Sequence, residues 1–281
     1  MGTLYLVATP IGNLEDITLR ALRVLKEVNL VAAEDTRSAR HLLTHFGIDQ
    51  PITSYYEHNK LDKLGAILDA LGNGDVAVIS EAGLPGLSDP GYELVRAALE
   101  QNIRVVPIPG PSALTTALVA SGLPTDQFVY LGFLPRQKNA RRKLLQSVAG
   151  EPRTLVAYEA PHRIRDTLDD ILETLGDRAM CAARELTKLY EEFFRGTVNA
   201  ARAHFAAHEP RGEFTLVVAG KSEEIRETTE MWDDPRVLEA VRDLIASGLS
   251  RTDAVKRVAR SSGRDRREVY KLTMVHSHLR S

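Results

Sequence analysis

The chain has 281 residues, which is more than one typical core needs and enough for two domains with an appendage. Hydrophobic residues make up 43% and charged residues 26%, an ordinary globular composition that excludes a disordered or low-complexity protein. The single cysteine, Cys181, excludes an internal disulfide framework and a cysteine-rich zinc site. No apolar run approaches the about 18–20 residues that span a membrane, and the N-terminus lacks the pattern of a signal peptide. We therefore expect a soluble cytoplasmic protein without a membrane partner.

The net charge of −2 conceals an asymmetry along the chain. Residues 236–281 contain 11 Lys and Arg against 5 Asp and Glu, a net charge of +6, which leaves −8 on the rest. A basic tail on an acidic body is typical of a protein with a polyanionic partner. A solvated helical face accounts for the same charges equally well.

Short β-branched runs alternate with amphipathic stretches in the first part of the chain. The runs predict strands over residues 4–8, 30–33, 76–80 and 104–108, and the stretches predict helices over residues 19–28, 61–72, 92–100 and from Ser112 onward. In the first helix, Leu19, Leu22, Leu25 and Val28 fall on one face, and Asp16 or Thr18 can cap its start. Strand and helix in alternation favour βαβ units with a parallel sheet.

The rest of the chain predicts a second α/β domain and a helical end. Strands are expected over 128–132, 154–158, 179–184 and 214–220, with helices over 141–148 and 164–175. After a charged linker, three short helices are expected over 235–246, 251–260 and 266–276, in a layout that resembles a helix-turn-helix. Ser250 is a good N-cap for the second of them. The predicted domains are residues 1–121, 122–222 and 231–281.

Several enzyme classes lose support because their motifs are missing. No Gly-x-Gly-x-x-Gly follows a strand, and Gly220-Lys221-Ser222 lacks the upstream glycine of a phosphate-binding loop. Gly110-Pro111-Ser112 lacks the second glycine of a nucleophile elbow, and there is no His-Glu-x-x-His zinc motif. A dehydrogenase, a nucleotide hydrolase, a serine hydrolase and a zinc protease are therefore disfavoured, and no metal site is expected.

Three loops rich in glycine and proline follow predicted strands: residues 9–16, 80–91 and 109–113. Ligands of open α/β sheets bind at this carboxyl edge, where glycine lets a ligand approach the backbone and proline fixes the loop. Ser88 or Asp89 can cap the helix that follows, whose free amides suit a ligand carboxylate. One such loop is ordinary turn chemistry, but three at one edge favour a site for a small-molecule ligand.

The same loops carry a family resemblance. The opening Leu4–Asp16 resembles the ribosomal RNA 2′-O-ribose methyltransferase branch of the tetrapyrrole methylase superfamily, which modifies a decoding-centre cytidine of 16S rRNA in the small subunit. The resemblance continues through residues 33–37, 80–91, 107–113, 122–126, 159–163, 184–188 and 212–214. It implies two α/β domains of the tetrapyrrole methylase type, S-adenosyl-L-methionine bound in the cleft between them, and a homodimer.

The residues that the resemblance assigns to the methyl donor lie in the three loops. They are Pro10, Gly12, Ser80, Glu81, Ala82, Gly83, Pro85, Ser88, Gly110, Ser112 and Ala113. The family pattern of the central loop is Ser-Asp-Ala-Gly-Thr-Pro, from which this chain departs at Glu81 and Leu84. Contacts made by those two side chains are in question, whereas backbone contacts from Ala82 and Gly83 are expected to be kept.

Methyl transfer to a hydroxyl requires alignment of the two groups and gains from a base that takes the proton. The candidate catalytic residues are Glu159, His162 and Glu185, with Glu34 and Asp35 behind them; each of them can also be a structural ion-pair or helix-start residue. Tyr158 and Phe133 are candidates for stacking on a base or adenine. The candidate RNA-binding residues are Arg163, Arg184, Lys188, Lys256, Arg257, Arg260, Arg264, Arg266 and Arg267.

Two other functions remain open at this point. Methylation of a small macrocycle belongs to the same superfamily, although a macrocycle needs neither the basic tail nor the motif Thr9–Asp16. A catalytically silent RNA-binding module for ribosome assembly is the second, and the departures at Glu81 and Leu84 favour it slightly.

Overall fold

The computed structural model describes residues 2–221 and 232–275, without the side chains of Arg260 and Val275. Residues 1–221 form one compact unit and residues 222–281 a second one. The charged linker and His276, the predicted end of the last helix, lie outside the described residues. No helix within the described ranges is long and apolar enough to cross a membrane.

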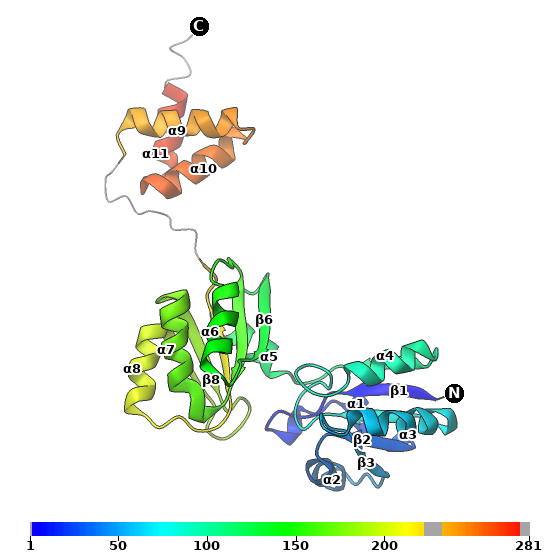
Figure 1. The fold of residues 1–281 in the computed structure, drawn as a ribbon. Helices are drawn as coiled ribbons and strands as arrows, with labels where there is room; N and C mark the ends of the chain where they lie inside the picture. The colour runs from blue at the N-terminus through cyan, green and yellow to red at the C-terminus, as the bar shows by residue number, and fades with distance from the viewer. Residues whose placement is uncertain (1, 222–231, 276–281) are drawn as a thin grey trace. The chain divides into compact units, whose positions relative to one another are not determined.

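The first half of the larger unit is a parallel five-stranded sheet flanked by helices, drawn in blue to cyan in Figure 1. The strand order is β3-β2-β4-β1-β5, with β1 (Thr3–Val7), β2 (Leu30–Ala33), β3 (Ile52–Ser54), β4 (Val76–Ile79) and β5 (Arg104–Ile108). The helices are α1 (Leu19–Glu27), α2 (Thr36–His45), α3 (Lys60–Asn73) and α4 (Tyr92–Glu100). All four residues of β4 are buried, as expected for a strand covered on both faces. The predicted parallel sheet is confirmed.

The second half contains a mixed sheet of five strands in the order β6-β7-β10-β8-β9. Its strands are β6 (Phe128–Phe133), β7 (Thr154–Glu159), β8 (Ala179–Arg184), β9 (Glu192–Thr197) and β10 (Phe214–Val218). The last strand, β10, is inserted antiparallel between β7 and β8, and β6–β7 is the one neighbouring pair of this sheet that is parallel. Helices α6 (Lys138–Ser147), α7 (Ile164–Leu175) and α8 (Val198–Ala207) pack together on this half.

Helix α5 (Ala113–Ala120) joins the two halves. It follows the last strand of the first sheet, yet its buried residues Leu114, Ala117 and Leu118 pack with Val156 and Val217 of the second sheet. Figure 1 shows α5 beside the strands of the second half. The chain therefore crosses from one sheet to the other before α5, and the two halves share a core.

The described part of the smaller unit, residues 232–275, contains three helices, α9 (Asp234–Ala246), α10 (Arg251–Ser262) and α11 (Arg266–Val275). A small apolar core around Val241, Val255 and Val269 holds them together. Ser250 caps α10 as predicted, because its hydroxyl accepts a hydrogen bond from the Asp253 amide at 3.1 Å. Gly263, with φ +67°, makes the left-handed turn between α10 and α11.

The structure contains strands and helices that the hydrophobic periodicity of the sequence did not predict, and it corrects details at the start of two helices. Strands β3 and β9 and helices α2 and α8 were not predicted: β3 has only three residues and β9 is a partly exposed strand at the edge of its sheet. Thr18 caps α1 by accepting from Ala21, whereas Leu19 is 85% exposed and not on the buried face. The predicted cap of α4 by Ser88 or Asp89 is wrong, because Gly91 holds the cap position and no side chain bonds there.

A buried ion cluster ties α6 to α7. Asp170 is 1% exposed, and its carboxylate accepts from Arg141 Nε at 2.8 Å and from Arg142 Nε at 2.6 Å. Arg141 is itself buried, while Arg142 also pairs with the exposed carboxylate of Glu173. Removal of one partner from a buried pair leaves an uncompensated charge, so Asp170 is a point on which the second half depends.

We expect Asp170→Asn to lower the free energy of unfolding by about 3 kcal/mol or more, because two guanidinium groups lose their shared carboxylate. The neighbouring variant Asp169→Asn is the control, because Asp169 pairs with Arg202 at the surface. The control should cost about 1 kcal/mol or less. Urea unfolding followed by circular dichroism measures both, and equal losses would contradict a special role for the buried pair.

Candidate cofactor and active site

The first two of the three predicted ligand loops are joined at the carboxyl edge of the parallel sheet. Thr9 and Gly83 exchange backbone hydrogen bonds, with N–O distances of 2.9 and 3.1 Å. The buried hydroxyl of Ser80 donates within its own loop, to the carbonyl of Ala82 or of Gly83. Gly83 has φ +81°, a conformation that side chains rarely adopt, so glycine is required at this junction. The two loops therefore form one fixed wall.

A cavity of about 770 Å³ opens against this wall, between the two halves of the larger unit. We call it the donor cavity. Its lining combines all three loops with the second sheet: Pro10, Ile11, Gly12, Leu14, Glu34, Ser38, Glu81, Ala82, Gly83, Leu84, Leu87, Ser88, Asp89, Ser112, Ala113, Phe133, Tyr158, Glu159, Ala160, Pro161, His162, Leu186, Lys188, Glu213, Phe214 and Thr215. Its size and mixed lining are those of a site for a small molecule or cofactor.

Most of the residues predicted to hold a cofactor line this cavity. Those that do are Pro10, Gly12, Glu81, Ala82, Gly83, Ser88, Ser112 and Ala113. Ser80, Pro85 and Gly110 do not line it. Gly110 lies so close to Ala8, the residue after β1, that an added Cβ would come within 2.9 Å of the Ala8 Cβ, so a packing requirement accounts for this glycine.

Three carboxylates gather on one side of the donor cavity: Glu34, Glu81 and Asp89. Burial raises the pKa of Asp89 to about 7, and the nearby carboxylate of Glu34 adds to that effect. Burial likewise raises the pKa of Glu34, although its carboxylate accepts from the Glu81 amide at 3.2 Å. Sequence reasoning assigned Asp89 only as a helix cap. Its place in the cavity could be found only from the fold of the loop.

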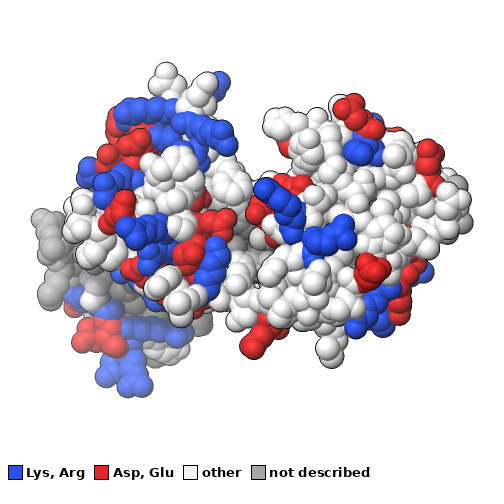
Figure 2. Space-filling model, turned by 90° about the horizontal axis from the view of Figure 1, so that it is seen from below, with Lys and Arg blue, Asp and Glu red and all other residues white. Residues whose placement is uncertain are grey.

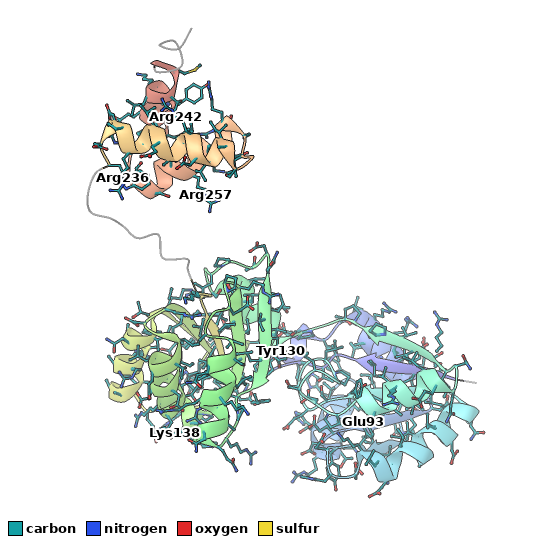
Figure 3. All side chains as sticks on the ribbon, turned by 45° about the horizontal axis from the view of Figure 1, so that its top comes forward. Glu93, Tyr130, Lys138, Arg236, Arg242 and Arg257 are labelled. Carbon is teal, nitrogen blue, oxygen red and sulfur yellow. The ribbon has the colours of Figure 1, made fainter. Side chains whose placement is uncertain are left out.

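Aromatic side chains of the second sheet also line the cavity. Tyr158 and Phe133 lie with ring centres 5.3 Å apart, and Tyr158 also packs on Tyr130. Tyr130 is labelled in Figure 3, where it lies at the junction of the two halves, and its hydroxyl is 2.6 Å from the Ser88 hydroxyl. The Tyr158 hydroxyl accepts from the amide of Leu114 at 3.1 Å. These contacts fasten the central loop and α5 to the second sheet.

The structure places the predicted catalytic residue Glu159 in a buried network of hydrogen bonds. Its carboxylate is buried, pairs with Arg163, and accepts from the Thr167 hydroxyl at 2.6 Å and the Ala160 amide at 2.8 Å. With its oxygens occupied in this way, Glu159 anchors the turn at the end of β7. The same pair holds Arg163, which also donates to the Leu134 carbonyl, so Arg163 is not available to a phosphate.

The other two candidate bases differ from each other. Glu185 accepts from Lys188 Nζ at 2.8 Å and from the Glu213 amide at 3.0 Å. Burial alone would raise the pKa of Glu185, but these hydrogen bonds outweigh it and lower the pKa below its usual value. A carboxylate held in this way is a weak base. His162 is exposed at the rim of the donor cavity, in a short 3-10 helix.

The remaining predicted RNA-binding side chains divide into paired and exposed groups. Arg184 pairs with Glu192 at 3.0 Å, and Lys188 bridges Glu185 and Glu213. In the smaller unit, Arg264 pairs with Asp234 and donates to the Trp232 carbonyl, so it stabilises the three-helix fold. Exposed side chains remain at Lys256, Arg257, Arg266 and Arg267, and the side chain of Arg260 lies outside the described residues. Arg257 projects from the outside of α10 in Figure 3.

A second cavity, of about 600 Å³, lies next to the donor cavity on the first half alone. We call it the lateral cavity. It is lined by the ends of β1 and β4 and by one face of α2: Thr9, Pro10, Leu14, Asp35, Arg37, Ser38, Ala39, His41, Leu42, Ile79, Ser80 and Glu81. Pro10, Leu14, Ser38 and Glu81 line both cavities. Figure 2 shows the waist between the two halves, with Lys or Arg and Asp or Glu close together on both sides of it.

Solved structures share the fold of the larger unit. The fold matches the native form of uroporphyrin III C-methyl transferase from Thermus thermophilus, with a TM-score of 0.55 and 21% identity over 78% of this chain and 97% of that one. It also matches the methyltransferase CobJ, with a TM-score of 0.60 and 17% identity over 78% of this chain and 95% of that one. At these identities the likeness shows the fold.

Sequence comparison is more specific. The chain is 49% identical over 273 residues to "Ribosomal RNA small subunit methyltransferase I" of Halalkalibacterium halodurans, which covers 96% of this chain and 94% of that protein. The protein of the same name from Synechocystis is 48% identical over 98% of both chains. The one from Thermotoga maritima is 51% identical over 222 residues, 79% of this chain and its own whole length. The profile of Tetrapyrrole (Corrin/Porphyrin) Methylases matches residues 3–201, and the chain belongs to this family of methyltransferases.

Proposed function

We propose that the protein transfers the methyl group of S-adenosyl-L-methionine to the ribose 2′-hydroxyl of a decoding-centre cytidine in 16S rRNA of the small ribosomal subunit. The observation that carries this proposal is the donor cavity, whose loops are those that the family resemblance assigns to the cofactor. The relatives that match nearly the whole chain, and that act by name on small-subunit ribosomal RNA, support the substrate. We also infer that the enzyme is cytoplasmic and acts as a homodimer, as the family resemblance implies.

The residues of the donor cavity fit the cofactor. Its volume of about 770 Å³ lies in the range of cofactor sites. The carboxylates of Glu34, Glu81 and Asp89 give one side a negative potential, which suits a positively charged sulfonium. Tyr158 and Phe133 offer ring faces for an adenine. When bound, the cofactor supplies an activated methyl group with a good leaving group.

The chain's own residues then have to position the acceptor hydroxyl and keep water away. The joined loops at Thr9 and Gly83 hold the wall of the cavity in a fixed place, and the contact of Ser88 with Tyr130 secures the central loop. Most of the catalytic effect expected from such a site is alignment of the two reacting groups.

The exposed Lys and Arg side chains of the smaller unit bind phosphates of the RNA backbone. The Thermotoga relative is about as long as the larger unit alone, which supports an auxiliary role for the smaller one.

The direct test is incubation of the protein with small ribosomal subunits and a radiolabelled methyl donor, followed by mapping of the labelled nucleotide. We expect one label per subunit, on a ribose oxygen of a decoding-centre cytidine. Label on a base atom would refute the proposed mechanism. Transfer to a corrin or porphyrin precursor, with none to the subunit, would instead establish the macrocycle activity of the wider family.

The pKa of about 7 at Asp89 predicts a pH-dependent affinity for the cofactor. A cation near this carboxylate favours its charged form, so affinity for S-adenosylmethionine should rise as the pH increases from 6 to 8. The neutral thioether of S-adenosylhomocysteine should show a smaller rise. In Asp89→Asn the difference between the two ligands should no longer vary with pH. Calorimetric titration of both ligands at pH 6, 7 and 8 measures this. A difference between the ligands that varies with pH in Asp89→Asn as much as in the wild type would contradict the prediction.

The exposed cations of α11 predict a salt-dependent contribution to RNA binding. Replacement of Arg266, Arg267 and Lys271 by Gln should weaken binding to the small subunit and reduce the slope of log affinity against log salt, by roughly 0.7–0.9 for each phosphate that is no longer neutralised. Cofactor affinity should stay unchanged. The control replaces three exposed cations of α1 instead: Arg20, Arg23 and Lys26. Equal salt slopes for the two triple variants would argue against binding by the smaller unit.

A further inference from the structure

We propose that the lateral cavity receives the acceptor nucleotide, turned out of its RNA strand, and that Glu81 on the shared wall accepts the proton of its hydroxyl. This inference rests on the proposed function and adds to it the place of the acceptor and the identity of the base. It follows from the relation of the two cavities and from the state of each carboxylate near them.

The lateral cavity and the donor cavity are adjacent. Pro10, Leu14, Ser38 and Glu81 line both cavities, so a molecule in the lateral cavity contacts the wall against which the donor cavity opens. Methyl transfer requires the donor carbon and the acceptor oxygen within about 3–3.5 Å of each other. Enzymes that do chemistry on a stacked base turn the nucleotide out into a pocket, and we expect the same of this acceptor nucleotide. A cavity of about 600 Å³ has room for a nucleoside.

The side chains that line the lateral cavity suit a nucleotide. Leu14 and Leu42 offer apolar surface to the faces of a base, and Ser38 and His41 offer groups for hydrogen bonds to its edge or to the ribose. Arg37 pairs with Asp35 at 3.2 Å through one guanidinium nitrogen, but its side chain is 91% exposed, so its remaining N–H groups can meet a phosphate of the RNA strand.

Helix α2 lines one side of this cavity because residues 37 and 41, and 38 and 42, are four positions apart and lie on one side of the helix. The Asp35 carboxylate caps the helix, since it accepts from the amides of Arg37 at 2.7 Å and Ser38 at 3.3 Å. Those two amides are therefore occupied. Recognition of the nucleotide in this cavity depends on side chains and not on the start of the helix.

The contacts of the nearby carboxylates indicate which of them can accept the proton of the hydroxyl. Glu159 is fully occupied in its buried pair with Arg163, and Glu185 is held by Lys188 and the Glu213 amide. Within residues 2–221 and 232–275, by contrast, the carboxylate of Glu81 makes no hydrogen bond or salt bridge, although its backbone amide is bonded to Glu34. Glu81 is therefore an exposed carboxylate on the wall shared by the two cavities.

The step balances with groups already named. The ribose oxygen forms a bond to the methyl carbon as the bond between that carbon and the sulfonium breaks. The electron pair of the broken bond stays on sulfur, which becomes a neutral thioether. The proton of the hydroxyl passes to the Glu81 carboxylate and from there to water.

The test of the cavity uses the full chain and two neighbouring variants of α2. His41 lines the lateral cavity, whereas the exposed Arg40 does not line it. We expect His41→Trp to fill the cavity and lower kcat/KM for small subunits at least 100-fold, with S-adenosylhomocysteine affinity within twofold of wild type. Arg40→Trp should stay within threefold in both measurements. Saturation-transfer NMR with cytidine 5′-monophosphate and saturating S-adenosylhomocysteine should give a signal for the wild type and Arg40→Trp but not for His41→Trp.

The outcomes separate the two proposals. If the wild type methylates subunits and His41→Trp behaves like Arg40→Trp in turnover and NMR, the acceptor site is elsewhere and the proposed function stands. If the wild type transfers no methyl group to subunits, the proposed function fails and this inference fails with it. If His41→Trp also loses cofactor affinity, the two cavities are not separate sites and the inference is overturned.

The role of Glu81 has its own pair of variants. Glu81→Gln keeps the size of the side chain but cannot take a proton, so we expect kcat to fall about 100-fold or more while KM for subunits changes little. Glu81→Asp keeps the carboxylate and should recover most of kcat. Affinity for the neutral S-adenosylhomocysteine should be similar in both variants. The kcat values are compared at saturating S-adenosylmethionine, because loss of the Glu81 charge in Glu81→Gln also weakens binding of the sulfonium. Equal kcat values in Glu81→Gln and Glu81→Asp would show that this carboxylate does not act as the base.

Discussion

The site depends on the pairing of Thr9 with Gly83. This short exchange of backbone hydrogen bonds joins the loops that follow β1 and β4, two neighbouring strands of the parallel sheet. The carboxyl edge of such a sheet leaves its loops free to take many shapes, and here one pair of amides and carbonyls fixes two of them at once. Pro10 and Glu81, one and two residues from the paired positions in the chain, line both the donor cavity and the lateral cavity.

The buried carboxylates of the two halves of the larger unit differ in whether they form ion pairs. In the second half, buried carboxylates such as Asp170 and Glu159 are paired with arginines and hold helices and turns in place. In the first half, no arginine or lysine among residues 2–221 and 232–275 forms an ion pair with Glu34 or Asp89, and burial raises the pKa of both carboxyl groups. Unpaired, partly buried carboxylates cost stability and are typical of functional sites. This contrast makes Glu34 and Asp89 better candidates for a functional role than the paired acids of the second half.

The sequence predicted the parallel sheet, the three ligand loops and the helical end of the chain. Strongly apolar strands such as β4 and clear caps such as Ser250 carry their own local signal. The roles of Glu159, Glu185 and Arg163 could not be predicted, because partners close in space decide whether a charged side chain is free. The insertion of β10 between β7 and β8 was hidden for the same reason: strand order is a long-range property that periodicity does not record.

The position of α5 has a consequence for how the protein responds to its ligands. Because this helix follows the first sheet in the chain and packs into the core of the second, separation of the halves would expose Leu114 and Leu118 together with Val217. Opening of the cleft is thus tied to loss of the core, and the walls of the donor cavity belong to one cooperative folding unit. Occupancy of that cavity should raise the melting temperature of residues 1–221 as a whole, in a single transition that grows with ligand concentration.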